Sequence, residues 1–415
     1  MTTPNDRARL REVAAEYVEV VNSDEMNARR ERWRRSNRLL ERTVPFQIED
    51  NGSFFHDLMP KPECEGEQER SFEARMLWAL TNYRLIPDDR VFPRTFHVGW
   101  AVSRSSICPE LEVRRVPDST GRELGFETNT PLADLANSFH KLRSTEFSVD
   151  RDATLRQAEA ATDLFGDILP VEIVGGDVAG VGTGFAMNAV LLIGMDDFYI
   201  ALLDQPENAH RFFEFQCADA ERFLAWLEEG RLITPNGHEH DCGSGSCVYS
   251  DELPRRVIAP GDSVLASDCW GFIEAQEAAG LSPAAYAEFI YPYQKRIADR
   301  LGLINYGCCE AVHRFWPTLE GFRNLRKVTV SPWCDVPSIS ASVGRRAVLS
   351  RKPHPLQLCG ASFDAVGFES HIRETLDITR DNFIELIFRD TCPLNGSMRE
   401  RVAQACGIIK KVEGR

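Results

Sequence analysis

The amino-acid sequence predicts an α/β protein built around a single (β/α)8 TIM barrel, with an N-terminal helical extension and a lid-like insertion. Two observations lead to this prediction: short apolar runs of strand type alternate with longer helical patterns, and eight such runs follow residue 42. Eight parallel strands are the number that closes a barrel of this kind. The chain shows no internal repeat and no low-complexity tract, and the eight runs lead us to assign residues 43–415 to one barrel domain.

The first expected element is a helical extension over residues 1–42, which carries many arginines and glutamates, as in EMNARRERWRRSNRLLER. This composition predicts a solvated segment without catalytic residues. The eight strands that follow are expected at TVPFQI (43–48), VFPRTFHV (91–98), LPVEIVGG (169–176), DSVLAS (262–267), LGLINYGC (301–308), RKVTVSP (326–332), RAVLS (346–350) and NFIELIFR (382–389).

The helices between the strands carry clear start and stop signals. In SPAAYAEFIYPYQKRIADRLG, Ser282 is the expected N-cap, Pro283 opens the first turn and Gly302 ends the pattern. The run GVGTGF lacks the full dinucleotide fingerprint, so we interpret it as a tight turn before a helix whose free amides could bind an anion.

Two insertions interrupt the barrel pattern. Residues 111–127 predict a β-hairpin, and residues 232–254 form a loop rich in Gly, Ser, His and Cys. Loops of this kind often act as mobile covers, so both insertions are expected to cover the barrel mouth, with the glycines as hinges.

Composition restricts the partners of the protein. A formal net charge of −15 opposes binding to nucleic acid or to an anionic membrane surface, since both require a cationic face. The sequence has no apolar leader and no apolar run of membrane-spanning length, so we expect a cytoplasmic protein. Twelve cysteines in that compartment should be mostly reduced, and some of them could be metal ligands.

Active sites of such barrels lie at the carboxyl ends of the strands, so the residues that follow each run are candidates. They are Glu49, His97, Asp177, Asp268, Cys308 with Glu310, Trp333 with Cys334, Arg351 with Lys352 and His354, and Asp390 with Cys392. We expect Asp268 and His97 to orient the substrate or move a proton, and Trp270 and Trp333 to line an aromatic pocket. The cationic group Arg351, Lys352 and His354 would suit a carboxylate, a phenolate or a corrin side-chain amide, or could be a solvated turn.

The stretch LINYGCCE carries the most specific chemistry. If the strand continued through it, side-chain alternation would place Tyr306, Cys308 and Glu310 on one face and Cys309 on the other. Cys308 and Glu310, joined by Cys392, could then hold a tetrahedral Zn²⁺ with one vertex open for the substrate.

Alternative interpretations remain open for these residues. The cysteines could be small core residues, and Glu310 could instead pair with Arg351 or Lys352. His97 and the tryptophans could likewise be core residues. The cluster HEHDCGSGSC offers a competing zinc site. The ligands of that second site would be His238, His240, Cys242 and Cys247.

Several phrases in the same order resemble the uroporphyrinogen decarboxylase superfamily, in particular its cobalamin-dependent methyltransferase branch. They are LFGDILPVEIVGGD, GMDDFYIALLDQPENAHRFF, SDCWGFIEAQEAAGLSPAAYAEFIYPYQKRI, NYGCCEAVHRFWPTLEGFRNLRKVTVSPWCD and IELIFRDTCPLNGSMRERV. The resemblance implies a single (β/α)8 barrel and a zinc ion held by a His-x-Cys pair and a later cysteine. Cys308 and Cys392 stand where the two cysteines would be, and Tyr306 stands in place of the histidine.

The expected function is therefore a zinc-assisted methyltransferase that moves a methyl group from a small methylated or methoxylated molecule to a corrinoid protein. No corrinoid-binding segment is visible in the sequence, so cobalamin would arrive on a separate protein. The alternatives are a metal-free decarboxylase that holds a polycarboxylate with Arg351 and Lys352, and a barrel that binds a small molecule without catalysis.

Overall fold

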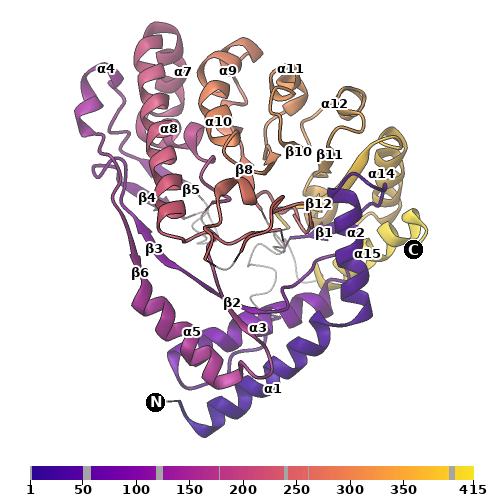
Figure 1. Cartoon of the computed structure of the whole chain (residues 1–415). Coiled ribbons are helices and arrows are strands. Elements are labelled where there is room, and N and C mark those ends of the chain that lie inside the picture. The colour runs from indigo at the N-terminus through magenta and orange to yellow at the C-terminus, as the bar shows by residue number, and fades with distance from the viewer. Residues whose placement is uncertain are drawn as a thin grey trace.

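The computed structural model describes residues 2–49, 58–117, 125–176, 178–237, 242–259, 261–391 and 398–415 (Figure 1). The α-helices are α1 (Pro4–Val21), α2 (Asp24–Asn37), α3 (Glu67–Leu85), α4 (Leu135–Ser138), α5 (Arg151–Phe165), α6 (Phe185–Ile193), α7 (Met195–Asp204), α8 (Pro206–Glu229), α9 (Pro283–Phe289), α10 (Tyr291–Ala298), α11 (Trp316–Leu319), α12 (Val336–Val343), α13 (Leu356–Cys359), α14 (Ala365–Ile378) and α15 (Met398–Glu413). The strands are β1 (Phe46–Ile48), β2 (Phe96–Gly99), β3 (Ala101–Arg104), β4 (Val113–Val116), β5 (Gly125–Thr128), β6 (Phe147–Asp150), β7 (Val171–Val174), β8 (Trp270–Ile273), β9 (Leu303–Tyr306), β10 (Leu325–Val330), β11 (Val348–Arg351) and β12 (Phe383–Phe388).

Six parallel strands form one curled sheet in the order β1-β12-β11-β10-β9-β8, and β2 and β7 form a separate parallel pair. Within the described residues no strand ladder joins β1 to β2 or β7 to β8, so the sheet is a curled half-barrel and the expected closed eight-stranded barrel is not confirmed. Connecting segments occupy both gaps. The carboxylate of Asp89 accepts a hydrogen bond from the Phe46 amide at 3.0 Å, and the Phe272 amide donates to the Ala179 carbonyl at 2.8 Å.

Seven of the eight expected runs contain a strand of these two sheets, and the fourth was misplaced. The run DSVLAS ends in a 3-10 turn (Ala266–Asp268), and its Leu265 is 39% exposed. The strand is the next apolar run, WGFI, which pairs in parallel with β9. Trp270 at its start is fully buried, and its backbone is held by the side-chain amide of Asn236. Pairing and burial therefore favour the later run.

The helices obey their terminal signals. Ser282 caps α9 by accepting a hydrogen bond from the Ala285 amide at 3.1 Å, as expected. The pattern that was expected to continue to Gly302 breaks at Ile290, and α10 carries Pro292 in its first turn. Proline lacks the amide hydrogen that would continue the preceding helix, which explains the break.

The N-terminal extension is helical, but it is not merely solvated. Leu10 of α1 and Trp33 of α2 are fully buried in a hydrophobic cluster that also includes residues of α3 and α5 (Figure 1).

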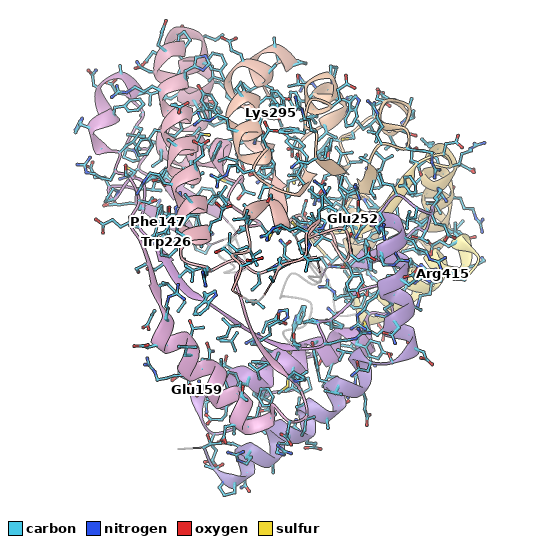
Figure 2. All side chains as sticks on the ribbon, in the orientation of Figure 1. Phe147, Glu159, Trp226, Glu252, Lys295 and Arg415 are labelled. Carbon is cyan, nitrogen blue, oxygen red and sulfur yellow. The ribbon has the colours of Figure 1, made fainter. Side chains whose placement is uncertain are left out.

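Further along the chain, Phe147 of β6 packs against Trp226 of α8 with ring centroids 5.6 Å apart (Figure 2). The β3–β6 ribbon is thereby attached to the helical layer.

The two insertions behave differently. The expected hairpin is formed by the antiparallel pair β4 and β5. Residues 242–250 of the second insertion, which we name the plug loop, are mostly buried rather than covering the mouth. Their polar groups bond to β9, β10 and β12, through Asn305, Lys327 and Glu385, and to Lys352 directly after β11. These contacts show that residues 242–250 pack against the concave side of the sheet instead of lying exposed over the mouth, whereas the expected mobility of the insertion stays a prediction.

Across the described residues, no single helix has the length and apolar composition needed to cross a membrane. Among the helices that the structure describes, one pair, α6 and α7, bent by 102°, meets that test when its two helices are taken together.

Candidate functional site

The two thiols of the CysCys pair lie together beyond the carboxyl end of β9. Gly307 has a positive φ of 98°, a conformation that L side chains rarely adopt, and it turns the chain out of the strand. Strand alternation therefore stops before Cys308, and the sulfurs of Cys308 and Cys309 lie 3.7 Å apart instead of on opposite faces. Cys309 is exposed and Cys308 is half-buried.

Tyr306, the last residue of β9, lies away from this pair. It is fully buried, and its hydroxyl is 2.7 Å from the hydroxyl of Tyr286 on α9. Its ring also packs against Phe322 at 5.6 Å. Because neighbouring strand residues face opposite sides, Asn305 points to the plug loop and Tyr306 points to the helices. The structure does not bring Tyr306 to the substrate side.

Charged and polar groups surround Cys308. A hydrogen bond from the Cys309 thiol lowers the pKa of Cys308 most strongly, and the Lys352 ammonium and Ser244 hydroxyl lower it further. The same interaction, together with burial, raises the pKa of Cys309. A thiolate is the nucleophilic and metal-binding form of cysteine. Without a bound metal, the pair therefore divides into one thiol that ionises readily and one that remains protonated as its donor.

Lys352 follows β11 and is the buried cation of the site. Its ammonium donates to the Ser244 hydroxyl and to Thr329 Oγ1 at 3.4 Å, and burial lowers its pKa to about 8. Within the described residues Lys352 has no carboxylate partner, and its neighbours include both thiols. The sulfur of Cys308 is therefore positioned to be its counter-ion.

Ser244 reaches the site because of an unusual backbone. Gly243, Ser244 and Gly245 all have positive φ, at 97°, 57° and 72°. Such a conformation is costly for serine and persists when surrounding contacts enforce it. The Gly243 carbonyl accepts from Asn305 Nδ2 at 3.2 Å, which fixes this turn against β9. Sequence analysis missed Ser244, although a serine between two glycines is the available signal.

Arg389 is a second residue that sequence analysis missed. It directly follows β12, and its guanidinium makes a two-pronged ion pair with Glu49 at 2.7 and 2.9 Å. It also donates to Ser244 Oγ at 3.4 Å. Its place after a strand was the available signal. This pair links the ends of β1 and β12, and the Arg389 guanidinium contributes to the lowered pKa of Cys308.

Glu310 connects the ends of β8 and β9. It is fully buried, with Oε1 accepting from the Ala275 amide at 3.0 Å and Oε2 accepting from the Cys308 amide at 2.7 Å. Burial raises its pKa to about 7, and the nearby Glu274 carboxylate acts in the same direction. Both oxygens are used by the backbone, so Glu310 positions Cys308 and pairs with neither Arg351 nor Lys352.

Two more glutamates follow β8. Glu274 accepts from the Gly184 amide at 3.2 Å, at the start of α6. The anion expected at that helix start is therefore supplied by the chain itself. Glu277 is buried, Oε2 has no hydrogen-bond partner among the described residues, and burial raises its pKa.

Three predicted site residues lie elsewhere. Asp268 precedes β8 instead of following a strand, and it pairs with Arg256 at 2.7 Å. Trp270 is a core residue at the start of β8. Arg351 donates to the carbonyls of Val330 and Ser331 at 3.2 and 2.7 Å, with its Nε unpartnered in the described structure. Arg351 and Lys352 are consecutive, so their side chains point to opposite sides of the sheet, and of these two cations Lys352 lies near Cys308.

The other candidates are dispersed. Trp333 is 66% exposed and meets the ring of His354 edge-on at 5.6 Å, so these two residues form part of the rim after β10 and β11. His97 of β2 lines a separate cavity of about 240 Å³ together with Glu172 and Tyr249. Four candidates lie outside the described residues: Asp177, His238, His240 and Cys392.

The residues fit zinc only in part. Two sulfurs bound to one tetrahedral Zn²⁺ at about 2.3 Å lie roughly 3.8 Å apart, close to the 3.7 Å between Cys308 and Cys309. Glu310 does not fit, since its oxygens accept from backbone amides. Within the described part of the chain, no three His, Cys, Asp or Glu residues gather as a metal site.

Comparison with known proteins yields a likeness of fold. No family model and no curated protein matches the sequence. Among solved structures, a methyltransferase from Methanosarcina mazei is similar, with a TM-score of 0.52 and 12% sequence identity. The match covers 92% of this chain and 98% of that chain, so the likeness of fold extends along nearly the full length of both chains.

Proposed function

We propose that this protein is a methyltransferase that takes a methyl group from a small methylated or methoxylated molecule and transfers it to the corrinoid of a separate protein. The observation that carries the proposal is the paired thiols at the carboxyl end of β9, with a lowered Cys308 pKa beside the buried Lys352. The fold shared with a methyltransferase and the resemblance of the sequence phrases support the same reaction.

Zinc would be held by Cys308 and, as the resemblance implies, by Cys392, with Cys309 as the third ligand in place of Glu310. The sulfur separation of 3.7 Å supports the exchange of Glu310 for Cys309. When bound, zinc supplies Lewis-acid activation of the oxygen, nitrogen or sulfur atom that loses the methyl group.

The other residues act on charge and position. As the methyl group leaves, its bonding electron pair remains on the leaving atom, and the Lys352 ammonium stabilises the charge that develops there. With a pKa near 8, Lys352 Nζ is protonated at neutral pH and can give its proton to that atom. Ser244 orients Lys352, and Glu310 holds the Cys308 backbone amide at 2.7 Å.

The test combines zinc content with methyl transfer to free cob(I)alamin. Wild type, Cys308→Ser, Cys309→Ser and Cys64→Ser would be assayed with a methoxylated benzoate, a methylated thiol and a methylated amine. We expect about one zinc per chain and methylcobalamin from one donor, with both lost in Cys308→Ser. Cys64 is buried in the cluster that contains α1 and α3, so Cys64→Ser is the matched control and should retain both.

Absence of zinc from wild type after zinc supplementation, with equal methyl transfer by Cys308→Ser, would refute the proposal. Retention of zinc by Cys309→Ser would refute the specific role of Cys309 as a ligand.

A second candidate function is decarboxylation of a polycarboxylate without metal. It is favoured by the buried Lys352 ammonium, which has no carboxylate partner among the described residues and could hold a substrate carboxylate. Release of CO₂ from a polycarboxylate by metal-stripped protein, abolished in Lys352→Met, would favour this reaction. Ligand binding without turnover in either assay would instead indicate a non-catalytic barrel.

A further inference from the structure

A second polar cavity, of about 460 Å³, lies at the opposite end of the sheet from Cys308. It is bordered by α2, the connection to β1, the end of α14 and the end of α15, and its wall includes residues that precede β1 and β12. Five guanidinium groups line it, from Arg32, Arg42, Arg373, Arg380 and Arg415. Two carboxylates, Asp377 and Glu413, also line it, and Asp89 and Glu369 pair with arginines of the wall, so the guanidinium groups exceed these carboxylates by one.

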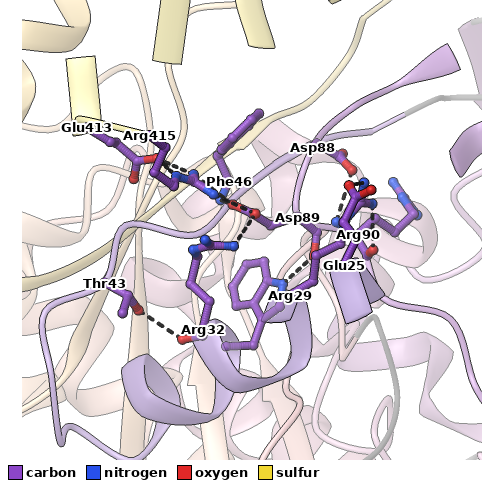
Figure 3. Close-up of polar contacts among 11 residues, drawn as sticks. Glu25, Arg29, Arg32, Thr43, Phe46, Asp88, Asp89, Arg90, Glu413 and Arg415 are labelled. Atoms are coloured by element: carbon purple, nitrogen blue, oxygen red, sulfur yellow. Dashed lines mark hydrogen bonds and ion pairs between the residues drawn. The ribbon is translucent and has the colours of Figure 1, made fainter. Parts of the chain in front are cut away.

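Three of the five arginines have carboxylate partners. Arg32 and Arg415 each pair with Asp89 at 2.8 Å, and Arg415 also pairs with Glu413 (Figure 3). Arg373 pairs with Glu369 on its own helix at 2.7 Å. These pairs hold the wall of the cavity in place and neutralise part of its charge.

The two remaining arginines have no such partner among the described residues. Arg42 donates only to the carbonyl of Leu376 at 3.4 Å, and its buried Nε makes no hydrogen bond. Burial lowers its pKa, which shows that the charged form is poorly solvated there. Arg380 donates to the carbonyl of Asp377 at 2.8 Å. Arg42 is half-buried and Arg380 is exposed. Glu413 and Asp381 act on Arg42 electrostatically without an ion pair among the described residues, so most of its donors remain available to a bound anion.

We propose that this cavity binds a small multivalent anion that carries phosphate groups. Guanidinium groups present flat forks of donors that match phosphate oxygens. A tetrahedral phosphate can engage Arg42 and Arg380, which come from different elements, whereas one planar carboxylate satisfies a single fork. The volume lies within the range of small-molecule sites, roughly 300 to 1,000 Å³.

Glu413 makes the affinity depend on pH. Burial raises the pKa of Glu413 to about 7, and the Asp89 carboxylate also raises it. The Arg415 and Arg32 guanidinium groups lower it, but burial has the larger effect. Arg42 also lies within electrostatic range of Glu413. Below pH 7 the protonated Glu413 no longer repels an anion, so binding should be tighter at pH 6 than at pH 8.

The test uses inorganic pyrophosphate as the probe and isothermal titration calorimetry of the whole protein at low ionic strength. We expect Arg42→Gln and Arg380→Gln each to weaken binding by about 10-fold, since each removes a charge-assisted contact to phosphate. Arg156→Gln removes the same charge from the exposed face of α5, outside the cavity, and should change the affinity less than twofold. Citrate should bind at least 10-fold more weakly than pyrophosphate.

A second measurement does not depend on the variants folding. Pyrophosphate should raise the melting temperature of the wild-type protein by a few degrees above sodium chloride of equal ionic strength, because a ligand that binds only the folded state stabilises it. Absence of both heat and melting shift at 10 mM pyrophosphate would overturn the proposal. If Arg156→Gln lost as much affinity as Arg42→Gln and Arg380→Gln, pyrophosphate would be responding to the overall charge of the protein and not to this cavity, and the proposal would be overturned. If citrate bound as tightly as pyrophosphate, the assignment to phosphate would be overturned.

Discussion

Replacing Lys327 with methionine should destabilise the folded protein by about 4 kcal/mol, because it leaves the buried Glu385 carboxylate without its cation. Lys327 of β10 and Glu385 of β12 are both fully buried and lie 2.5 Å apart. The ammonium also donates to Ser246 Oγ at 2.9 Å and to the Cys247 carbonyl at 2.7 Å. Three hydrogen bonds from a charged donor, at roughly 1.5 kcal/mol each, give the same magnitude.

The measurement is urea unfolding followed by far-UV circular dichroism for wild type, Lys327→Met, Glu385→Gln and the double variant. Each single change strands one buried charge, so both should be costly. The double variant removes both charges and should be less destabilised than the sum of the two single variants, by about 2 to 4 kcal/mol. A loss below about 1 kcal/mol in Lys327→Met, or strict additivity in the double variant, would refute the reasoning.

The same substitution tests whether the plug loop supports the thiol site. Ser246 and Cys247 belong to that loop and are fastened by Lys327, while Ser244 in the same loop contacts Lys352. Loosening the loop should therefore also slow alkylation of Cys308 by iodoacetamide at pH 7. Unchanged alkylation in a Lys327→Met protein that is measurably destabilised would separate the loop from the site.

Three further outcomes are expected. Lys352→Met should raise the pKa of Cys308 and slow its alkylation at pH 7 at least several-fold in zinc-free protein, and an unchanged pH profile would contradict the role of this cation. The pKa of Glu310 is raised from 4.5 to about 7 in the folded protein, so between these pH values the unfolded chain loses its proton while the folded protein keeps it. The contribution of Glu310 to the free energy of unfolding is therefore complete below pH 4.5 and is lost as the pH rises to 7. In Glu310→Gln, the free energy of unfolding measured with urea should not show this loss of about 3 kcal/mol between pH 4.5 and 7. The same pH dependence of the free energy in the variant and in wild type would contradict the expectation. Gly243→Ala should lower the melting temperature by several degrees, because Gly243 has a φ of 97° and an aromatic ring of β8 occupies the place of the added Cβ. Gly176→Ala should leave the melting temperature unchanged, because the added Cβ meets open space.

The strands and the chemistry at the end of β9 could be predicted from local sequence. Buried parallel strands appear as short apolar runs between helical patterns, and seven of the eight were found in this way. The thiols were placed correctly after β9 because a residue that follows a strand lies at its carboxyl end. The run WGFI was missed because two apolar runs stood close together, and pairing with β9 selected the second.

Only the tertiary structure decided which side chains meet. Ser244 and Lys352 are 108 residues apart, and no local pattern indicates their contact. A single positive φ at Gly307 placed the sulfurs of Cys308 and Cys309 side by side. The sequence by itself therefore determined where strands and reactive groups occur, because local periodicity reports burial. The composition of the site depended on long-range packing of the plug loop, which periodicity does not encode.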